Sequence, residues 1–230
     1  MTVEQLRATL AEQYSLAEAT YKVAGFSLCI TSVADSYNLL DRISPEEFLK
    51  DEQMPYWAEI WPSSFVLSNY LAGEIGVAGK RGIELGAGVG LVGVALRKAG
   101  ARVLVTDYAT EALDFIRLNA LQNGIALDEQ FAVASLDWRN IRLEETFDFL
   151  CAADVLYERR NLLPILLAIE KLLKPSGIAY IADPRRQIAS GFVALAEDNQ
   201  FSVQVASRPI AFNRKTMEVD VYALRKTSSS

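Results

Sequence analysis

The chain has 230 residues, 51% of them hydrophobic, which suits one large domain, or a domain with an appendage, around a sizeable core. Its net charge of −6 argues against a broad nucleic-acid surface, which would need a basic face. The sequence contains no histidine, which excludes Ser-His-Asp and Cys-His nucleophilic sites and histidine-containing zinc sites. We therefore predict no metal site, and chemistry that depends on carboxylates, Tyr, Lys, Arg or a cofactor.

The cysteines and the apolar runs indicate the cellular compartment in which the protein is expected. Cys29 and Cys151 lie in apolar, strand-like runs, which predicts buried free thiols and no disulfide framework. The N-terminus is amphipathic without the apolar core of a signal peptide, and no apolar run approaches the roughly 20 residues that span a bilayer. We expect a cytoplasmic monomer that does not enter a membrane.

Two elements are predicted near the N-terminus. Thr2 and Gln5 are placed to form the capping box of a first helix. Residues 21–32 are rich in Val, Phe and Ile and predict a strand of a small hairpin. We assign residues 1–53 to an N-terminal helix and β extension, and residues 54–226 to the main domain.

Two tryptophans and two prolines lie within residues 54–64, MPYWAEIWPSS. Pro62 can begin a helix over 63–72, because proline is favoured in a first helical turn. The functional hypothesis is a lid over a cofactor. The alternative is a set of core aromatic side chains beneath a loop, since tryptophans are usually largely buried.

The stretch from Arg81 to Asp107 predicts a strand, a glycine-rich turn, a helix and a second strand. Glycines let the backbone adopt positive φ and approach a ligand closely. The helix that follows presents unpaired N–H groups at its start. Asp107 ends the second strand, where an acidic residue can hold a ribose diol.

This turn fits two classes of cofactor. Gly88, Gly90 and Gly93 have the spacing of a dinucleotide-binding turn, so the spacing leaves that class open. Glu84 lies two residues before Gly86, where a carboxylate would repel a diphosphate and attract an amine. We therefore favour S-adenosylmethionine, which carries an ammonium, a sulfonium and a ribose diol.

The remaining chain alternates strands with helices and ends in two consecutive strands. Predicted helices are 110–121, capped by Thr110, then 162–173, which stops at 175–177, and 189–198; predicted strands are 130–135, 147–153, 178–182, 201–207 and 218–225. The alternation predicts an α/β fold with a doubly wound parallel sheet, and the last two strands predict an antiparallel hairpin at one edge. Residues 227–230 are expected to form a disordered tail.

An acidic residue stands at the end of each of five predicted strands: Glu84, Asp107, Asp137, Asp154 and Asp183. Ligands of open α/β sheets bind outside the carboxyl ends of the strands, so we expect these residues to meet in one crevice. The alternative for each is a solvated loop carboxylate or a helix cap. We expect Asp107 to bind ribose, Glu84 to lie near the methionine part, and Asp137 to bind the adenine amino group beside Trp138.

Six motifs then occur in order: PYWAEIWPSS, ELGAGVGLVG, VTDYATEAL, LDW, DVLYE and ADPRR. Together, over roughly residues 22–190, they resemble the family-16 seven-strand methyltransferases, in particular the lysine methyltransferases that act on the electron-transfer flavoprotein β subunit. The resemblance implies a Rossmann-like seven-strand sheet, S-adenosylmethionine as cofactor, and a protein lysine as acceptor. The chain departs from that branch at Ser63 and Ser64, where a glycine pair is usual.

These arguments together define the predicted site. The cofactor-binding residues are Trp61, Glu84, Gly86, Ala87, Gly88, Gly90, Asp107, Tyr108, Asp137, Trp138 and Asp154, and the catalytic residues are Asp154 and Tyr157. A small-molecule N- or O-methyltransferase and a non-catalytic cofactor-binding domain stay open as alternatives. An NAD-dependent oxidoreductase is disfavoured by Glu84 and by the lack of a Tyr-x-x-x-Lys or histidine acid.

Overall fold

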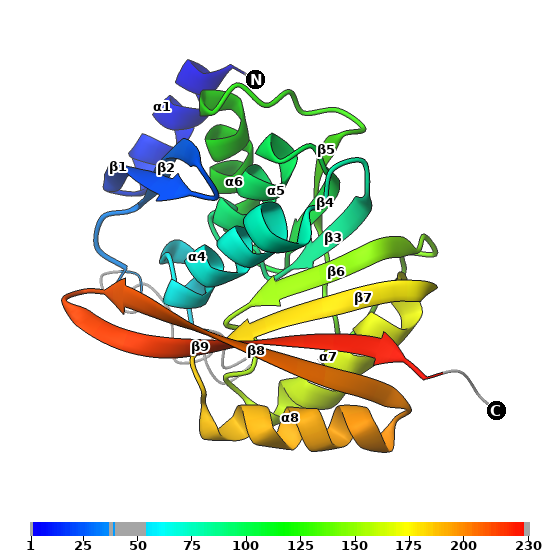
Figure 1. Cartoon of the computed structure of the whole chain (residues 1–230). Helices are drawn as coiled ribbons and strands as arrows, with labels where there is room; N and C mark the ends of the chain where they lie inside the picture. Colours follow the sequence, from blue (N-terminus) through cyan, green and yellow to red (C-terminus); the bar gives the residue numbers. More distant parts are fainter. Residues whose placement is uncertain (1, 37–38, 40–53, 228–230) are drawn as a thin grey trace, which may run out of the picture.

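A computed structural model describes residues 2–36, 39 and 54–227 and shows a central sheet with helices on both faces (Figure 1). The strands of this sheet are β3 (Arg81–Leu85), β4 (Arg102–Asp107), β5 (Phe131–Ser135), β6 (Phe147–Ala153), β7 (Leu173–Asp183), β8 (Phe201–Phe212) and β9 (Lys215–Lys226). The helices are α1 (Val3–Gln13), α4 (Pro62–Ser68), α5 (Leu91–Lys98), α6 (Thr110–Gln122), α7 (Arg159–Leu172) and α8 (Gln187–Asp198), with a 3-10 turn η1 (Tyr56–Ala58) and a π-helix η2 (Asn69–Ile75). No helix within these ranges is long and apolar enough to cross a membrane.

The strand order in the sheet is β5-β4-β3-β6-β7-β9-β8. Strands β3 to β7 are parallel, whereas β9 is antiparallel to both β7 and β8. The chain moves outward from β3 to β5 and then crosses back to place β6 on the other side of β3. This reversal is a topological switch point, where α/β sheets bind ligands. The predicted doubly wound sheet with a terminal antiparallel hairpin is confirmed.

Helices α4, α5 and α6 cover one face of the sheet, and α7 and α8 cover the other (Figure 1). Strand β6 contributes to both cores, because successive side chains of a strand point to opposite faces. Phe149 and Cys151 face the first layer, and Leu150 and Ala152 face the second. Burial on both faces explains why the predicted strand 147–153 is a continuous apolar run.

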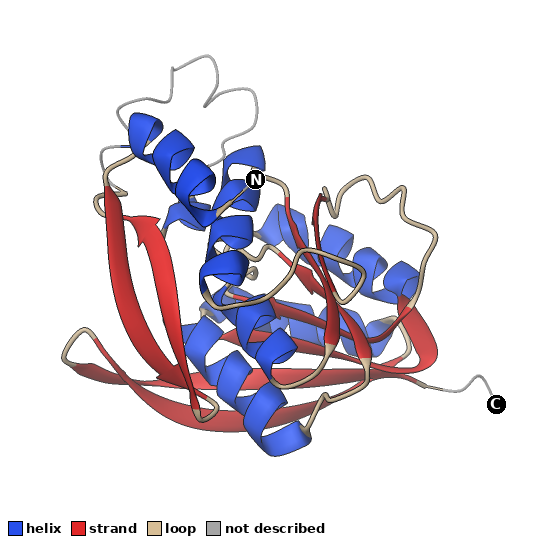
Figure 2. Cartoon of the chain, turned by 90° about the horizontal axis from the view of Figure 1, so that it is seen from above, coloured by secondary structure: helices blue, strands red, loops and turns tan. Residues whose placement is uncertain are grey.

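The N-terminal extension packs on α6. The capping box is present, with the Gln5 N–H donating to the Thr2 hydroxyl and the Thr2 N–H donating to the Gln5 side chain. The prediction of one strand over 21–32 is wrong, because a turn at Ala24 and Gly25 divides the segment between β1 (Leu16–Val23) and β2 (Phe26–Val33). The two strands form a separate hairpin beside the central sheet (Figure 2). The predicted boundary at residue 53 and residues 228–230 of the predicted tail 227–230 lie outside the described residues. Thr227 itself is held in place, because its N–H donates to the Gln200 carbonyl oxygen at 2.8 Å.

Two further predictions need correction. Thr110 does not cap α6: it is the first helical residue, and Ala109 is the N-cap. The Ala109 N–H donates to Asp107 Oδ1 at 2.9 Å, so a residue of the preceding strand supplies the acceptor. Strand β7 begins at Leu173, so Pro175 lies inside the strand and does not terminate the preceding helix. The earlier start reflects pairing between Phe147 and Leu173 ahead of a register shift.

Candidate functional site

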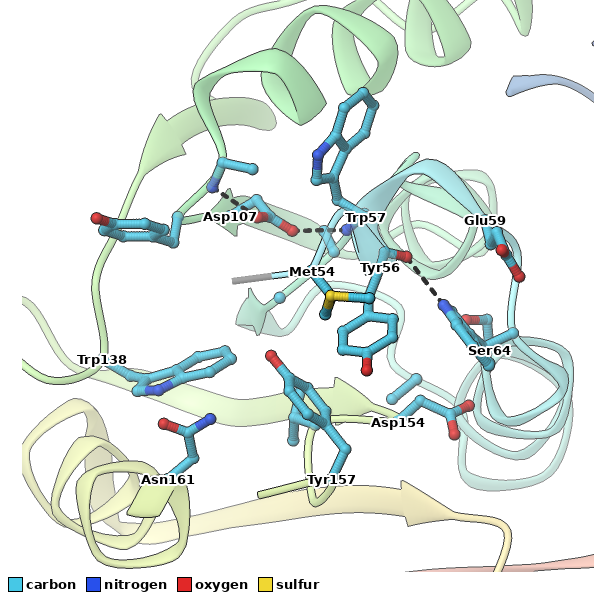
Figure 3. Close-up of a pocket in the computed structure, with 18 of the residues that line it drawn as sticks. Met54, Tyr56, Trp57, Glu59, Ser64, Asp107, Trp138, Asp154, Tyr157 and Asn161 are labelled. Atoms are coloured by element: carbon cyan, nitrogen blue, oxygen red, sulfur yellow. Dashed lines mark hydrogen bonds between the residues drawn. The ribbon is translucent and has the colours of Figure 1, made fainter. Parts of the chain in front are cut away.

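A pocket opens at the carboxyl ends of β3, β4 and β6, beneath residues 54–64 (Figure 3). The structure brings most of the predicted site residues to its wall. These are Trp61, Gly86, Ala87, Gly88, Asp107, Tyr108, Asp137, Trp138, Asp154 and Tyr157. Glu84, Gly90 and Asp183 are not among the lining residues, and each lies behind the wall for a reason given below.

The glycine turn after β3 forms one side of the pocket. Gly86, Gly88 and Gly90 have φ values of +64°, +56° and +85°, in the left-handed region that favours glycine. A Cβ on Gly88 would lie 3.0 Å from the carbonyl oxygen of Trp57. Gly90 packs against Ile116 of α6 and therefore supports the turn from behind.

Asp107 joins this turn to the start of α6. Its Oδ2 accepts the N–H of Gly88 at 2.8 Å, and its Oδ1 accepts the N–H of Ala109 at 2.9 Å. Burial raises the pKa of Asp107 to about 6, although the backbone N–H groups that it accepts favour the charged form. A carboxylate has about four lone-pair positions, so Asp107 retains the capacity to accept hydrogen bonds from a diol.

Glu84 lies behind the pocket wall and does not present a negative charge to the pocket. Its side chain is buried, with 2% exposure, and burial raises its pKa to about 8. The N–H of Gly93 favours the charged form but is outweighed by burial. A Cβ on Gly93 would lie 2.8 Å from Glu84 Oε2, so the acid packs against the first turns of α5. The structure thus does not place a negative charge of Glu84 beside a cationic ligand, in contrast to the expectation from sequence.

The loop after β5 continues the side of the pocket formed by the glycine turn, because a Cβ on Gly86 would lie 3.1 Å from the Trp138 ring. Asp137 Oδ1 accepts the backbone N–H and the side-chain Nε–H of Arg139, both at 2.9 Å. The Arg139 guanidinium in turn lies over the Tyr108 ring, 4.9 Å from its centroid. Trp138 points into the pocket (Figure 3). The predicted adenine side is therefore a wall of two aromatic rings with a carboxylate beside them.

Three aromatic rings line the pocket near β6. The Tyr56 ring lies 5.1 Å from the Tyr157 ring and 5.9 Å from the Trp61 ring, both edge-on. Trp61 Nε1 donates to the carbonyl oxygen of Tyr56 at 2.9 Å, which fixes the two rings together. Burial raises the pKa of Tyr157 to about 12, so its hydroxyl stays neutral.

We refer to Tyr56, Trp61 and Tyr157 as the aromatic wall. Tyr56 was missed in the sequence analysis, although it lies in the same motif as Trp61. Trp57 supports the pocket from the core side, because its ring packs 5.8 Å from Tyr14 and 5.5 Å from Phe115. Of the two tryptophans, Trp57 thus fits the alternative of a core aromatic residue.

Asp154 follows β6 with a φ of +60° and is held from two directions. Its Oδ2 accepts the N–H of Ser63, at the start of α4, at 3.1 Å. Its Oδ1 lies 2.7 Å from Nη1 of Arg186. The same Nη1 lies 2.8 Å from Oδ2 of the fully buried Asp183. Asp183 therefore supports the pocket through Arg186 and does not line it.

Comparison with curated proteins identifies relatives of this chain. Protein N-lysine methyltransferase METTL21A of Xenopus tropicalis is 36% identical over 110 residues, which are 46% of this chain and 50% of that protein. Protein N-lysine methyltransferase METTL21A of Mus musculus is 32% identical over 158 residues, 66% of this chain and 71% of that protein. The chain spans about half the length of METTL21A of Xenopus tropicalis and about half the length of METTL21E of Mus musculus.

Comparison with solved structures confirms the fold. Magnesium protoporphyrin IX methyltransferase of Synechocystis PCC 6803, solved with bound S-adenosylmethionine, matches with a TM-score of 0.59 at 17% identity, over 84% of this chain and 92% of that chain. Ribosomal protein L11 methylase of Lactobacillus delbrueckii matches with a TM-score of 0.53 at 19% identity, over 71% and 77%. Residues 48–199, more than half of the chain, match the lysine methyltransferase family. The chain therefore belongs to the lysine methyltransferase family.

Proposed function

We propose that this protein transfers a methyl group from S-adenosylmethionine to the side-chain amine of a lysine in a protein. The observation that carries the proposal is the pairing of two walls in one pocket. Asp107 and the glycine turn form one wall, and the aromatic wall with Asp154 forms the other. The membership of the lysine methyltransferase family and the names of the METTL21 relatives support the same substrate class.

The residues of the first wall suit the methyl donor. Asp107 would accept hydrogen bonds from the ribose hydroxyls, and Gly86 and Gly88 would let the backbone approach the ligand closely. Asp137 would accept a hydrogen bond from the adenine amino group, and Trp138 would lie beside the adenine ring. The cofactor supplies a methyl group on a sulfonium, which a neutral nucleophile can attack.

The residues of the second wall suit a lysine. The faces of aromatic rings attract ammonium and methylammonium groups, and the rings exclude water from the reacting atoms. Asp154 orients the amine. Because a free lysine has a pKa of about 10.4, the amine must lose its proton before it attacks. Tyr157 stays protonated at neutral pH, so it does not act as the base, and we assign this proton to solvent before the amine seats.

Catalysis then depends mainly on alignment of the amine with the methyl carbon, and such alignment contributes a large part of the rate acceleration when both reactants are held.

The test of the proposed function is a transfer assay with methyl-labelled S-adenosylmethionine and a lysate of cells that lack this protein. We expect a labelled protein band that yields methyl-lysine on hydrolysis, and no such band with Asp107→Ala. Label confined to small molecules would overturn the protein substrate and favour a small-molecule methyltransferase.

We further propose that the protein acts in the cytoplasm as a monomer. The free thiols of Cys29 and Cys151 support a reducing compartment. Fractionation of cells and size-exclusion chromatography with light scattering test the two statements separately. A dimer in solution or a secreted protein would contradict them.

A further inference from the structure

The ADPRR motif at the end of β7 places Arg186 directly behind the pocket. The guanidinium is half-buried and lies between two buried carboxylates, those of Asp154 and Asp183. Asp183 holds the backbone of the arginine as well, because its Oδ1 accepts the Arg186 N–H at 2.6 Å. Arg186 is therefore fixed at both its main chain and its side chain.

This cluster joins three segments that are distant in the sequence. Asp154 comes from the loop after β6, Arg186 from the loop after β7, and Ser63 from the first turn of α4. Oδ2 of Asp154 accepts from Ser63, and Oδ1 is paired with Arg186, so each oxygen of the carboxylate has a protein partner. The backbone at Asp154 is also unusual for a non-glycine residue, since its φ is +60°. A conformation of this kind persists only where the surroundings hold it.

The charges of the cluster do not balance. Two carboxylates share one guanidinium. Burial lowers the pKa of Arg186, but the charges and hydrogen bonding of Asp154 and Asp183 outweigh burial and raise the pKa, which keeps the arginine cationic. Of the two acids, Asp183 lies deeper and is fully buried, whereas Asp154 lines the pocket. The arginine therefore compensates the deeper acid and still holds the acid that a substrate can meet.

We propose that Arg186 is a positioning residue for methyl transfer, which acts by holding the Asp154 carboxylate against the start of α4. The proposal rests on the proposed function, in which Asp154 orients the acceptor amine. The Asp154 carboxylate accepts a hydrogen bond at Oδ2 and forms an ion pair at Oδ1, so rotation away from the pocket would break both contacts. The hydrogen bond from Ser63 also ties the carboxylate to α4, which follows Trp61 directly. Arg186 thus connects the orientation of Asp154 with the placement of the aromatic wall.

The neighbouring Arg185 offers a matched control. It lies on the same loop but pairs with Asp220 of β9, at 3.0 Å, and with the hydroxyl of Ser207 at 2.9 Å. Neither partner lines the pocket. Arg185→Gln removes the same charge as Arg186→Gln without a contact to Asp154.

The test compares Arg186→Gln, Arg185→Gln and the double variant Arg186→Gln with Asp183→Asn in the full chain. The double variant removes the deeper acid together with its counter-ion, so it relieves the buried charge that Arg186→Gln alone leaves behind. Three quantities are measured: the midpoint of thermal unfolding, the rate of hydrogen exchange at the Ser63 amide, and the separate kcat and KM values for the protein that the labelled-lysate assay identifies as the acceptor. Exchange at Ser63 reports the contact to Asp154 without any need for turnover.

We expect Arg186→Gln to accelerate exchange at Ser63 and to lower kcat by about 100-fold, because small misplacements of catalytic groups have effects of this size. Arg185→Gln should match the wild type. The double variant should regain the thermal midpoint but not the slow exchange or the kcat. Wild-type kcat in Arg186→Gln, or recovery of kcat in the double variant, would show that Arg186 is only a counter-ion for Asp183 and would overturn the proposal. If the wild-type protein transfers no methyl group, the proposed function is wrong. Independently of any activity, an unchanged exchange rate at Ser63 in Arg186→Gln would overturn the proposal that Arg186 holds Asp154 against α4.

Discussion

The buried acid behind the glycine turn predicts that the stability of the fold decreases as the pH rises. In the folded protein, burial raises the pKa of Glu84 from its ordinary value of 4.5 to about 8. The unfolded chain releases this proton near pH 4.5, whereas the folded chain keeps it until about pH 8. Between these values the folded state binds more protons, so the free energy of unfolding falls as pH rises.

The magnitude follows from the width of that window. Each pKa unit corresponds to about 1.4 kcal/mol, so a rise from 4.5 to about 8 sets an upper bound of about 5 kcal/mol. Relaxation of the protein and entry of water reduce such penalties, and we expect about 2 to 4 kcal/mol. Glu84→Gln keeps the shape of the side chain and removes its titration. The free energy of unfolding of the variant, relative to that of the wild type, should therefore increase by this amount as the pH rises from about 5 to about 8.

Urea unfolding followed by tryptophan fluorescence measures this difference at several pH values. Asp107 also has a raised pKa, but it is present in both proteins and its contribution largely cancels. Glu197→Gln, at an exposed position on α8, is the matched control and should show no pH-dependent difference. Parallel curves for the wild type and Glu84→Gln would refute the assignment of a protonated Glu84 in the folded protein.

Three further predictions concern the pocket. Gly88→Ala should weaken S-adenosylmethionine binding, measured by calorimetry, by about tenfold or more and should destabilise the fold by roughly 1 to 3 kcal/mol. The reason is that Gly88 has a φ of +56° and that the new Cβ would meet the carbonyl oxygen of Trp57. An unchanged affinity would contradict this prediction. Cofactor affinity should fall as the pH drops below about 6, since protonated Asp107 loses an acceptor for the ribose; Asp107→Asn should abolish that pH dependence, and a persisting slope would rule out Asp107 as its source. Tyr56→Ala should lower kcat/KM by about tenfold while Tyr56→Phe retains most activity, because the ring makes the aromatic wall; equal effects of both would point to the hydroxyl instead.

Local patterns in the sequence determined the architecture and the side of the pocket that the glycine turn forms. A run that is apolar at every position predicted the buried strand β6, and the Pro62 position predicted the start of α4. Gly86, Gly88 and Asp107 were predicted as one side of a pocket because the backbone geometry of a strand, a turn and a helix is local. Each of these features depends on residues close in sequence, so each can be predicted without knowledge of the fold.

Only the tertiary structure decided which acids face the ligand and which are internal. Glu84 and Asp183 lie at or next to the ends of their strands, as Asp107 does, yet the packing of α5 buries Glu84 and Arg186 forms an ion pair with Asp183. The sheet order brings the loops after β6 and β7 together, so Asp154 meets a partner more than thirty residues away in the sequence. The charge of a carboxylate depends on its burial and on its neighbours in space. For that reason the spacing of acids along the chain predicted a pocket, and the three-dimensional contacts determined its charge.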